Sequence, residues 1–274
     1  MTGQSPWLLC RRRRVDAASR LYCFPHSGGS VGEFLVWSDA LTDTEIWGVQ
    51  APGHGGRVHE EPLTSMAALV AAVADEVDLV PPYDLFGHSL GAAVAYELTL
   101  ALRVRGRPLP RCLYLSAHEA PHVHRADPSL PLRADDALLD EVEEQFGGVP
   151  ADLCDDPEWR ALVLGTLRAD LRIVAGYRPT VAEPLPCSVV AMGGTEDPVV
   201  TREGLAAWNA CTTGDFRLHM FAGGHFYLRE NQHDVLRHLA TDLARTARRV
   251  VPGTPALGTP AAVPGPGPGG GTPR

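Results

Sequence analysis

The sequence predicts an α/β protein in which a mostly parallel central sheet is flanked by helices on both faces. Short, nearly continuous apolar segments alternate with helical segments, which is the pattern of a parallel sheet buried on both sides. A tight strand–turn–helix element surrounds Gly-His-Ser-Leu-Gly at 87–91, and Gly-rich turns follow several other strands. Because parallel strands end at one edge of a sheet, these turns are expected to meet there.

The first part of the chain supplies two strands and two helices. The predicted elements are a strand over 20–24, a helix over 31–41, a strand over 46–49 and a helix over 65–80. The first strand ends at Pro-His-Ser-Gly-Gly-Ser and the second at Ala-Pro-Gly-His-Gly-Gly, both typical turn compositions. Thr64 is predicted to be the N-cap of the second, Ala-rich helix.

A third strand, over 83–86, leads into the sharpest predicted turn, and a helix follows from 92 to about 105. The turn reverses the chain within a few residues, and the two glycines of the motif let strand and helix pass closely. This geometry would hold Ser89 Oγ at the tip of the turn and place the N–H of Leu90 at the start of the helix. The alternative interpretation is a Gly-rich turn in which Ser89 is only an N-cap.

The strand–helix alternation is interrupted between about 121 and 179, after a strand over 112–116. A helix over 135–146 has one apolar face and a glycine just past its end. Asp-Pro then opens a second helix that runs to about 175. A helical insertion between two strands of such a sheet predicts a lid; the alternative is that these helices only cover the sheet edge.

The sheet resumes with a strand over 188–192, which ends at Gly-Gly-Thr-Glu-Asp-Pro. A helix over 202–209 leads to a strand over 216–221, which ends at Ala-Gly-Gly-His-Phe, and an amphipathic helix follows over 232–248. The Pro/Gly-rich end cannot bury enough apolar surface to become ordered, so a disordered tail is predicted. The predicted organisation is an N-terminal segment (1–19), one domain (20–250) with the lid insertion at about 121–179, and the tail (251–274).

Composition argues against several classes of function. The formal net charge of −9 disfavours nucleic acid and anionic membrane surfaces as partners, and no apolar run is long enough to span a membrane. The six cysteines contain no C-x-x-C pair and indicate reduced thiols in the cytoplasm. His118, His122 and His124 are closely spaced, but no carboxylate or cysteine pattern completes a metal site, so no metal is expected.

The chemistry predicted for Ser89 requires a base and a group that orients the base, because a serine hydroxyl is a weak nucleophile at neutral pH. Asp197 and His225 follow two later strands, in the order Ser, acid, His that this type of turn requires. Glu196 is the rival acid, and Asp197 is preferred because Pro198 fixes the chain just after it. These residues predict a catalytic triad of Ser89, Asp197 and His225.

The tetrahedral intermediate of acyl transfer also requires two N–H donors that form an oxyanion hole. The N–H of Leu90 is expected to be one, from the geometry of the turn. The second is expected from the loop after the first long strand. It is assigned to the N–H of Ser27, with Gly28 as the alternative.

Several motifs in collinear order resemble the type II thioesterases, which are stand-alone editing enzymes of polyketide and non-ribosomal peptide synthesis with the α/β-hydrolase fold. The matching segments are Phe-Pro-His-Ser-Gly-Gly-Ser (24–30), Ala-Pro-Gly-His-Gly-Gly-Arg (51–57), Gly-His-Ser-Leu-Gly-Ala (87–92), 116–121, Leu-Arg-Ala-Asp (167–170), Tyr-Arg-Pro (177–179) and Gly-Gly-His-Phe (223–226). The resemblance implies the same triad and a hydrolase without a cofactor of its own. Its implied substrate is an acyl thioester on the phosphopantetheine arm of an acyl or peptidyl carrier protein, in antibiotic-type biosynthesis. The chain departs from the family pattern at Ser27 (usually Ala), at Leu90 (often Met) and in its tail.

Three alternative functions remain open from the sequence. They are a general carboxylesterase or lipase-type serine hydrolase, a product-releasing thioesterase, and an inactive hydrolase fold that serves as a scaffold. Two groups of arginines could contact a carrier protein: Arg103, Arg105, Arg107 and Arg111, or Arg125, Arg133, Arg168 and Arg172. The first group is expected at the edge opposite the site, because a helix of about 15 residues is about 22 Å long, so the second group is better placed.

Overall fold

The strands form one mostly parallel sheet. The computed structural model describes residues 5–149 and 156–248, so Cys154 and the predicted tail lie outside the described residues. The described strands are β1 (Leu8–Leu9), β2 (Ser19–Phe24), β3 (Thr44–Val49), β4 (Tyr83–His88), β5 (Cys112–Ser116), β6 (Ser188–Gly194) and β7 (Phe216–Phe221). Their order is β1-β3-β2-β4-β5-β6-β7, and only the β1–β3 pair of this described sheet is antiparallel. The predicted fold class is confirmed.

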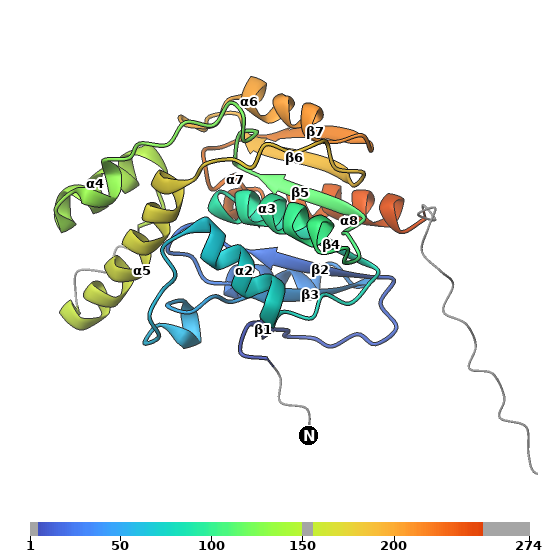
Figure 1. The fold of residues 1–274 in the computed structure, drawn as a ribbon, viewed down its shortest axis with the longest axis horizontal. Helices are drawn as coiled ribbons and strands as arrows, with labels where there is room; N and C mark the ends of the chain where they lie inside the picture. Colours follow the sequence, from blue (N-terminus) through green and yellow to red (C-terminus); the bar gives the residue numbers. More distant parts are fainter. Residues whose placement is uncertain (1–4, 150–155, 249–274) are drawn as a thin grey trace, which may run out of the picture.

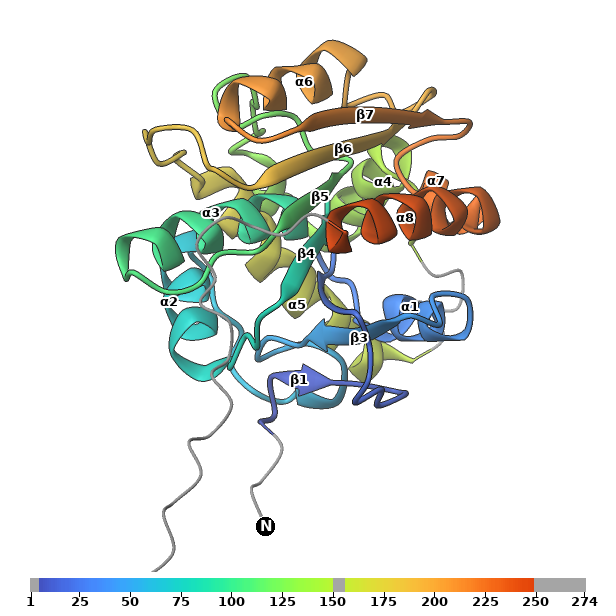
Figure 2. The ribbon, with the colours of Figure 1, turned by 90° about the vertical axis from the view of Figure 1, so that its right-hand side faces the viewer.

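Helices cover both faces of the sheet (Figures 1 and 2). The described helices are α1 (Gly32–Leu35), α2 (Met66–Glu76), α3 (Leu90–Val104), α4 (Asp135–Gln145), α5 (Pro157–Gly176), α6 (Arg202–Ala206), α7 (Tyr227–Glu230) and α8 (Gln232–Ala247), with 3-10 helices η1 (Val36–Asp39), η2 (Gly55–Arg57), η3 (Leu130–Leu132) and η5 (Ala207–Cys211). One core cluster lies under α2 and α3 and includes Val73, Leu98 and Trp208. A second lies under α1 and α8 and includes Trp37 and Leu239. Each large apolar side chain buried there contributes about 1.5–3 kcal/mol.

The strand that carries the site lies at the centre of this sheet. β4 pairs with β2 on one side and β5 on the other, and all six of its residues are buried. Its two central residues, Leu85 and Phe86, are apolar, as expected for a parallel strand with helices on both faces. The carboxyl end of β4 is therefore held rigidly by neighbours on both sides.

The insertion after β5 forms a separate helical layer. α4 and α5 lie beyond the carboxyl-terminal edge of the sheet (Figure 1). They share a small core of their own, which consists of Leu130, Leu138, Leu139, Val142, Leu164, Leu167 and Leu171. Because this cluster is distinct from the two cores of the sheet, the insertion packs as a unit above the edge where the site residues emerge.

The start of α2 differs from the prediction. The N-cap is Ser65, and the prediction of Thr64 is wrong by one residue. Ser65 has an extended backbone (φ −139°, ψ 145°), and its side chain accepts a hydrogen bond from the N–H of Ala68. Serine and threonine are comparable caps, so the backbone conformation decides which of two neighbours takes the role.

Other helix limits also differ from the prediction. α2 ends at Glu76 and not near 80, and Val77 is already extended (ψ 120°). Two prolines follow at 81 and 82, and a proline disfavours helical backbone in the residue before it. The helices expected over 31–41 and 202–209 each divide into a short α-helix and a 3-10 helix. α7, just after Phe226, and β1, within the N-terminal segment, were not predicted.

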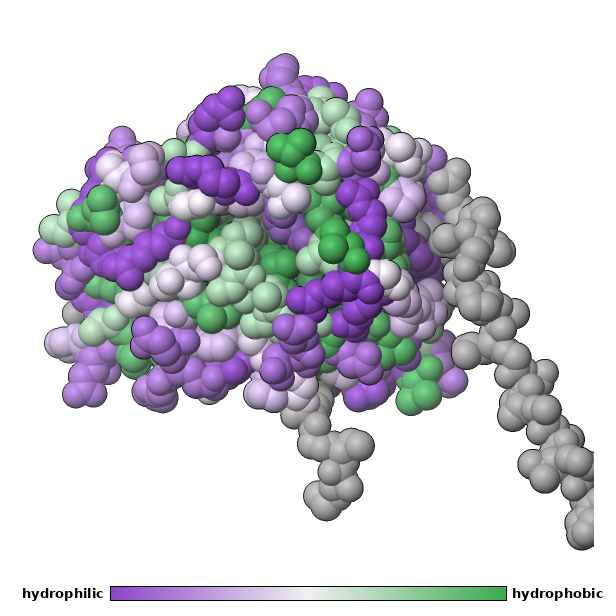
Figure 3. Space-filling view, in the orientation of Figure 1, coloured by the Kyte–Doolittle hydropathy of each residue, from purple (hydrophilic) through white to green (hydrophobic). Residues whose placement is uncertain are grey.

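Among the residues that the structure describes, no helix is both long enough and apolar enough to cross a bilayer. On the face shown in Figure 3, hydrophilic residues are interspersed with smaller apolar areas.

Candidate active site

Ser89 lies in the sharp turn between β4 and α3. Its backbone is in a strained positive-φ conformation (φ 53°, ψ −119°), and such strain costs about 1–3 kcal/mol. The turn is possible because a Cβ at Gly87 would meet the backbone of Gly91, and a Cβ at Gly91 would meet the backbone of Phe24. The N–H of Ser89 donates to the carbonyl of Ser116 (2.8 Å), which ties the turn to β5.

The side chain of Ser89 does not cap α3. It makes no capping hydrogen bond to the described start of that helix, although the residue occupies the N-cap position. The hydroxyl points toward His225, whose Nε2 lies 3.0 Å from Ser89 Oγ. This arrangement disfavours the interpretation of Ser89 as only an N-cap.

Asp197, His225 and Ser89 lie in hydrogen-bond contact in that order. The Nδ1–H of His225 donates to Oδ2 of Asp197 (2.8 Å). The other carboxylate oxygen of Asp197 accepts from the N–H groups of Val199 (3.0 Å) and Val200 (3.1 Å). The side chains of Asp197 and His225 are 0% and 3% exposed. The carboxylate is thus fixed by the chain that follows it, and it fixes the tautomer of the imidazole.

The rival acid Glu196 is placed differently. The residue is exposed, and its backbone N–H donates to the carbonyl of Gly223. Within the described chain its carboxylate has no recorded hydrogen bond to His225. The structure therefore brings Asp197 and not Glu196 to the imidazole.

The two expected oxyanion donors also lie at this site. Ser27 and Leu90 both line the cavity beside Ser89. Within the described residues, neither backbone N–H has a recorded acceptor. The alternative donor, the N–H of Gly28, is already bound to Oδ2 of Asp170 (2.7 Å). This geometry favours Ser27 over Gly28.

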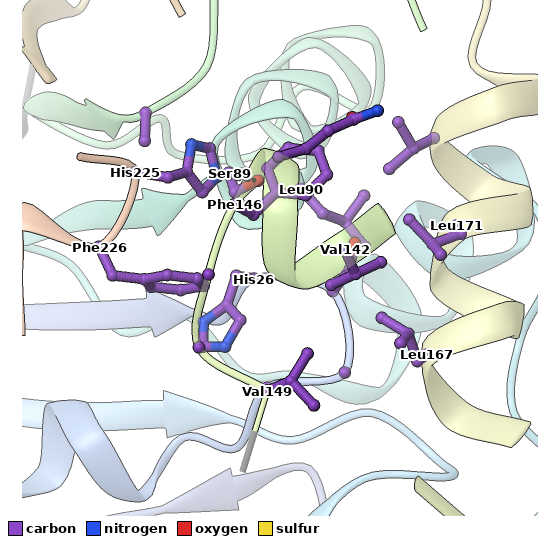
Figure 4. Close-up of a pocket in the computed structure, with 18 of the residues that line it drawn as sticks. His26, Ser89, Leu90, Val142, Phe146, Val149, Leu167, Leu171, His225 and Phe226 are labelled. Atoms are coloured by element: carbon purple, nitrogen blue, oxygen red, sulfur yellow. Dashed lines mark hydrogen bonds between the residues drawn. The ribbon is translucent and has the colours of Figure 1, made fainter. Parts of the chain in front are cut away.

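A cavity of about 580 Å³ opens beside these groups. Figure 4 shows Ser89 and His225 side by side, with Leu167 and Leu171 facing the cavity from α5. Val142 lines it from α4, and Phe146 lines it from the position just after that helix. The ring of Phe146 lies edge-on, 5.0 Å from the imidazole of His225. An apolar chain attached to a carbonyl group fits this lining.

Two buried histidines near the site are neutral. Burial lowers the pKa of His118 to about 3, and the neighbouring His124, which stacks on it at 4.3 Å, contributes in the same direction. Burial also lowers the pKa of His88 well below its usual value. His88 Nδ1 lies 2.8 Å from Ser116 Oγ, which in turn contacts the hydroxyl of Tyr227 (2.6 Å). The described residues contain no group of three or more side chains suited to hold a metal ion, so His118, His122 and His124 do not form such a group.

We expect acid to destabilise the protein through these two histidines. In the unfolded chain they gain protons as the pH falls below about 6.5, whereas in the folded state they stay neutral, so the free energy of unfolding falls with the pH. Each contributes a slope of up to about 1.4 kcal/mol per pH unit. His118→Asn should therefore make the free energy of unfolding less dependent on pH between pH 6.5 and 5, by the contribution of one histidine. Urea unfolding at several pH values measures this dependence. His233→Asn, whose side chain is 92% exposed, should leave the slope unchanged, and equal slopes in all three proteins would contradict the expectation.

The sequence indicated Ser89, Asp197 and His225 but gave no role to several other residues at this site. Asp170 and His54 contact each other (2.8 Å) below the loop that carries Ser27. Both belong to segments that resemble the family, at 167–170 and 51–57, but the spacing alone did not show that they meet. Phe146 was predicted only as part of the apolar face of α4.

Comparisons with known proteins match most of the chain. The sequence model of a family described as "Thioesterase domain" matches residues 19–243. The gramicidin S biosynthesis protein GrsT of Aneurinibacillus migulanus is 30% identical over 240 residues, which cover 86% of this chain and 93% of that protein. RedJ, a thioesterase from the prodiginine biosynthetic pathway in Streptomyces coelicolor, is 38% identical with a TM-score of 0.75 over 82% of this chain and 86% of that one. BorB, a type II thioesterase from the borrelidin biosynthetic cluster, is 31% identical with a TM-score of 0.79 over 90% of this chain and all of that one.

Proposed function

The chain belongs to the thioesterase domain family, and we propose that it is a serine hydrolase of acyl or aminoacyl thioesters on the phosphopantetheine arm of acyl or peptidyl carrier proteins. Its role is to remove aberrant or stalled groups from a polyketide or non-ribosomal peptide assembly line. The observation that carries the proposal is the contact chain from Ser89 through His225 to Asp197 beside a mainly apolar cavity. The similarity to the type II thioesterase BorB supports the editing role.

The proposed mechanism uses the groups of this site in two steps. His225 Nε2 takes the proton of Ser89 Oγ, which attacks the thioester carbonyl, and the N–H groups of Leu90 and Ser27 stabilise the negative oxygen. The carbon–sulfur bond breaks, and the thiol leaves with the proton from His225. Water then attacks the acyl-enzyme by the same route and releases the acid. Asp197 stabilises the imidazolium that forms in each step.

The substrate supplies the only prosthetic group in this proposal. The phosphopantetheine belongs to the carrier protein, and the hydrolase uses no cofactor of its own. Its proposed location is the cytoplasm, where the cysteines would be reduced. The described thiols of Cys23 and Cys112 are buried, and burial raises the pKa of each well above its usual value.

A panel of carrier proteins loaded with different acyl groups tests the function. Release of free acid, followed by mass spectrometry, is the expected result. A parallel assay compares an oxygen ester and a thioester with the same acyl group. Preference for the thioester supports the proposal, whereas preference for the oxygen ester would favour the alternative of a general carboxylesterase.

The arginines expected to contact the carrier differ in whether their side chains already pair with carboxylates of this protein. Arg168 pairs with Asp135 (2.6 Å), and Arg133 pairs with Glu141. Arg125 is exposed, lines the cavity, and its recorded bond is to the carbonyl of His124. Arg125 is therefore the lid arginine best placed to meet the phosphate of the arm or an acidic carrier surface.

The other arginine group is bound elsewhere. Arg105 pairs with Asp75 (2.5 Å), and Arg111 pairs with the buried Asp84 (2.5 Å). Arg103 and Arg107 donate to backbone carbonyls. Their side chains are occupied by contacts within the protein, which supports the choice of the lid side for docking.

We expect Arg125→Glu to lower kcat/KM for an acyl-carrier protein about tenfold, because a charge-assisted hydrogen bond contributes about 1.5–3 kcal/mol and this site is exposed. A small acyl thioester without the phosphate and the protein should be hydrolysed at nearly the original rate. Arg172→Glu is the matched control, since Arg172 is also exposed on the lid but does not line the cavity. Equal losses on both substrates would remove docking as the role of Arg125.

A further inference from the structure

One face of the lid helix α5 packs directly on the loops at the site. Thr166 Oγ1 donates to the carbonyl of Gly53 (2.6 Å), and the Leu167 side chain lies against Gly28, where an added Cβ would be 3.3 Å from Leu167 Cδ1. One turn further along the same face, Asp170 reaches the backbone of Gly28. The insertion is therefore fastened to the loop that carries Ser27 by the Asp170–Gly28 hydrogen bond and by apolar packing, and to the loop that carries Gly53 by a second hydrogen bond.

Asp170 is a buried carboxylate with two donors on one oxygen. The residue is 2% exposed, and its Oδ2 accepts from the N–H of Gly28 (2.7 Å) and lies 2.8 Å from Nε2 of His54. Burying a carboxylate is costly unless it is paired and hydrogen-bonded. Both conditions are met here, and both partners belong to loops at the site.

The contacts of His54 favour its positively charged form. Its Nδ1 lies 3.0 Å from the carbonyl oxygen of Pro52, and its Nε2 faces the carboxylate of Asp170. A carbonyl and a carboxylate only accept hydrogen bonds, so both contacts are satisfied when both ring nitrogens carry protons. Burial alone would lower the pKa of His54, but the hydrogen bond and the negative charge of Asp170 outweigh it and hold the pKa above its usual value.

This pair determines which backbone donor remains for the reaction. Each residue has one backbone N–H, and that of Gly28 is used by Asp170. Gly28 has a positive φ of 69°, which fits the sharp bend of the loop at this point. Ser27, whose N–H is left without a recorded acceptor in the described chain, lines the cavity beside Ser89. The imidazolium of His54 also offsets the charge of Asp170, which would otherwise oppose a developing negative oxygen nearby.

We infer that Asp170, held by His54, is a positioning residue for the oxyanion hole. It acts through the N–H of Gly28, fixes the loop over 26–29, and so directs the N–H of Ser27 to the oxygen of the tetrahedral intermediate. This inference rests on the proposed serine mechanism and adds to it a role for the lid insertion: α5 completes the oxyanion hole as well as covering the acyl group.

Asp170→Leu and Asp170→Asn test the inference on a small acyl thioester. Leucine has nearly the shape of aspartate but accepts no hydrogen bond, so kcat should fall about 100-fold with KM within about threefold. Asparagine retains an oxygen that can accept from Gly28, so Asp170→Asn should recover kcat to within about fivefold of the original enzyme. An acyl-chain boronic acid, which forms a tetrahedral adduct on Ser89, should bind Asp170→Leu about 100-fold more weakly.

Thr166→Val is the matched control. It also removes one hydrogen bond between α5 and a loop of the site, but that bond goes to Gly53 and not to the loop that carries Ser27. Its kcat should stay within about threefold, even where thermal unfolding shows a lower Tm. A loss of kcat in Thr166→Val equal to that in Asp170→Leu would overturn the inference, because general docking of α5 would then explain the effect. An equal loss in Asp170→Asn would also overturn it, because an oxygen able to accept from Gly28 would then not restore kcat.

The experiment separates the inference from the proposed function. Full activity of Asp170→Leu on thioesters would overturn the inference and leave the function intact. Failure of the unmodified enzyme to hydrolyse any thioester would overturn the function, and boronic acid binding would still report on the oxyanion hole. In that case unchanged boronic acid affinity in Asp170→Leu would overturn the inference as well.

Discussion

Replacing Ser89 with alanine is expected to lower kcat for thioester hydrolysis by roughly 10⁴- to 10⁶-fold and to abolish the acyl-enzyme. The hydroxyl lies 3.0 Å from His225 Nε2, at the tip of a strained turn. Without this oxygen no covalent intermediate can form, and the imidazole has no group to activate. When catalytic residues act as a unit in this way, replacing the first of them already removes most of the rate enhancement.

Two measurements test whether Ser89→Ala has lost the nucleophile. Intact-protein mass spectrometry after rapid quenching should detect the acyl adduct in the original enzyme and not in Ser89→Ala. A fluorophosphonate should label only the original enzyme. Unchanged thioester turnover in Ser89→Ala would refute the assignment of the nucleophile.

Ser65→Ala is the matched control for this prediction. Ser65 also occupies an N-cap position, but its side chain performs the capping, through the N–H of Ala68 (3.3 Å). Its replacement should cost about 1 kcal/mol of stability and leave turnover unchanged. Ser89 makes no such bond to α3, so Ser89→Ala should show the opposite pattern, with loss of activity and little loss of stability.

Much of this site could be predicted because its residues follow directly from the ends of strands. Ser89, Asp197 and His225 come a few residues after β4, β6 and β7, and parallel strands end at one edge. The order of the apolar segments therefore places the three side chains near one another without any knowledge of packing. The family predicted from the same motifs, the type II thioesterases, is confirmed by the matching domain and by solved structures such as BorB.

The contact between Asp170 and Gly28 could not be predicted in this way, because it joins residues 142 positions apart through a helix outside the sheet. The position of α5 depends on how its own apolar core packs, and no local pattern specifies that packing. β1 is also beyond local prediction, since two residues pair with β3 without a detectable alternation. The preference for Asp197 over the adjacent Glu196, by contrast, was predicted from Pro198, and Asp197 is the acid that lies in contact with His225.

Asp197→Asn is expected to lower kcat by about 10⁴-fold, as the same change does in a serine protease with this arrangement. Asp197 accepts the Nδ1–H of His225 on one oxygen and two backbone N–H groups, from Val199 and Val200, on the other. The backbone donors hold the amide oxygen of asparagine in its place, so the NH₂ group turns toward the imidazole. The imidazole then presents an unprotonated Nδ1 and carries its proton on Nε2, where it can no longer accept the proton of Ser89.

The neighbouring carboxylate gives the discriminating control. Glu196→Gln makes the same chemical change one residue away, on an exposed side chain without a recorded bond to His225 in the described chain. Its kcat should stay within about twofold, so the two variants are expected to differ by several thousandfold. A loss in Glu196→Gln as large as that in Asp197→Asn would mean that the acid exchanges between the two positions during turnover. Normal activity of Asp197→Asn would mean that His225 is oriented by another group, because a fixed amide at this point cannot stabilise the imidazolium as a carboxylate does.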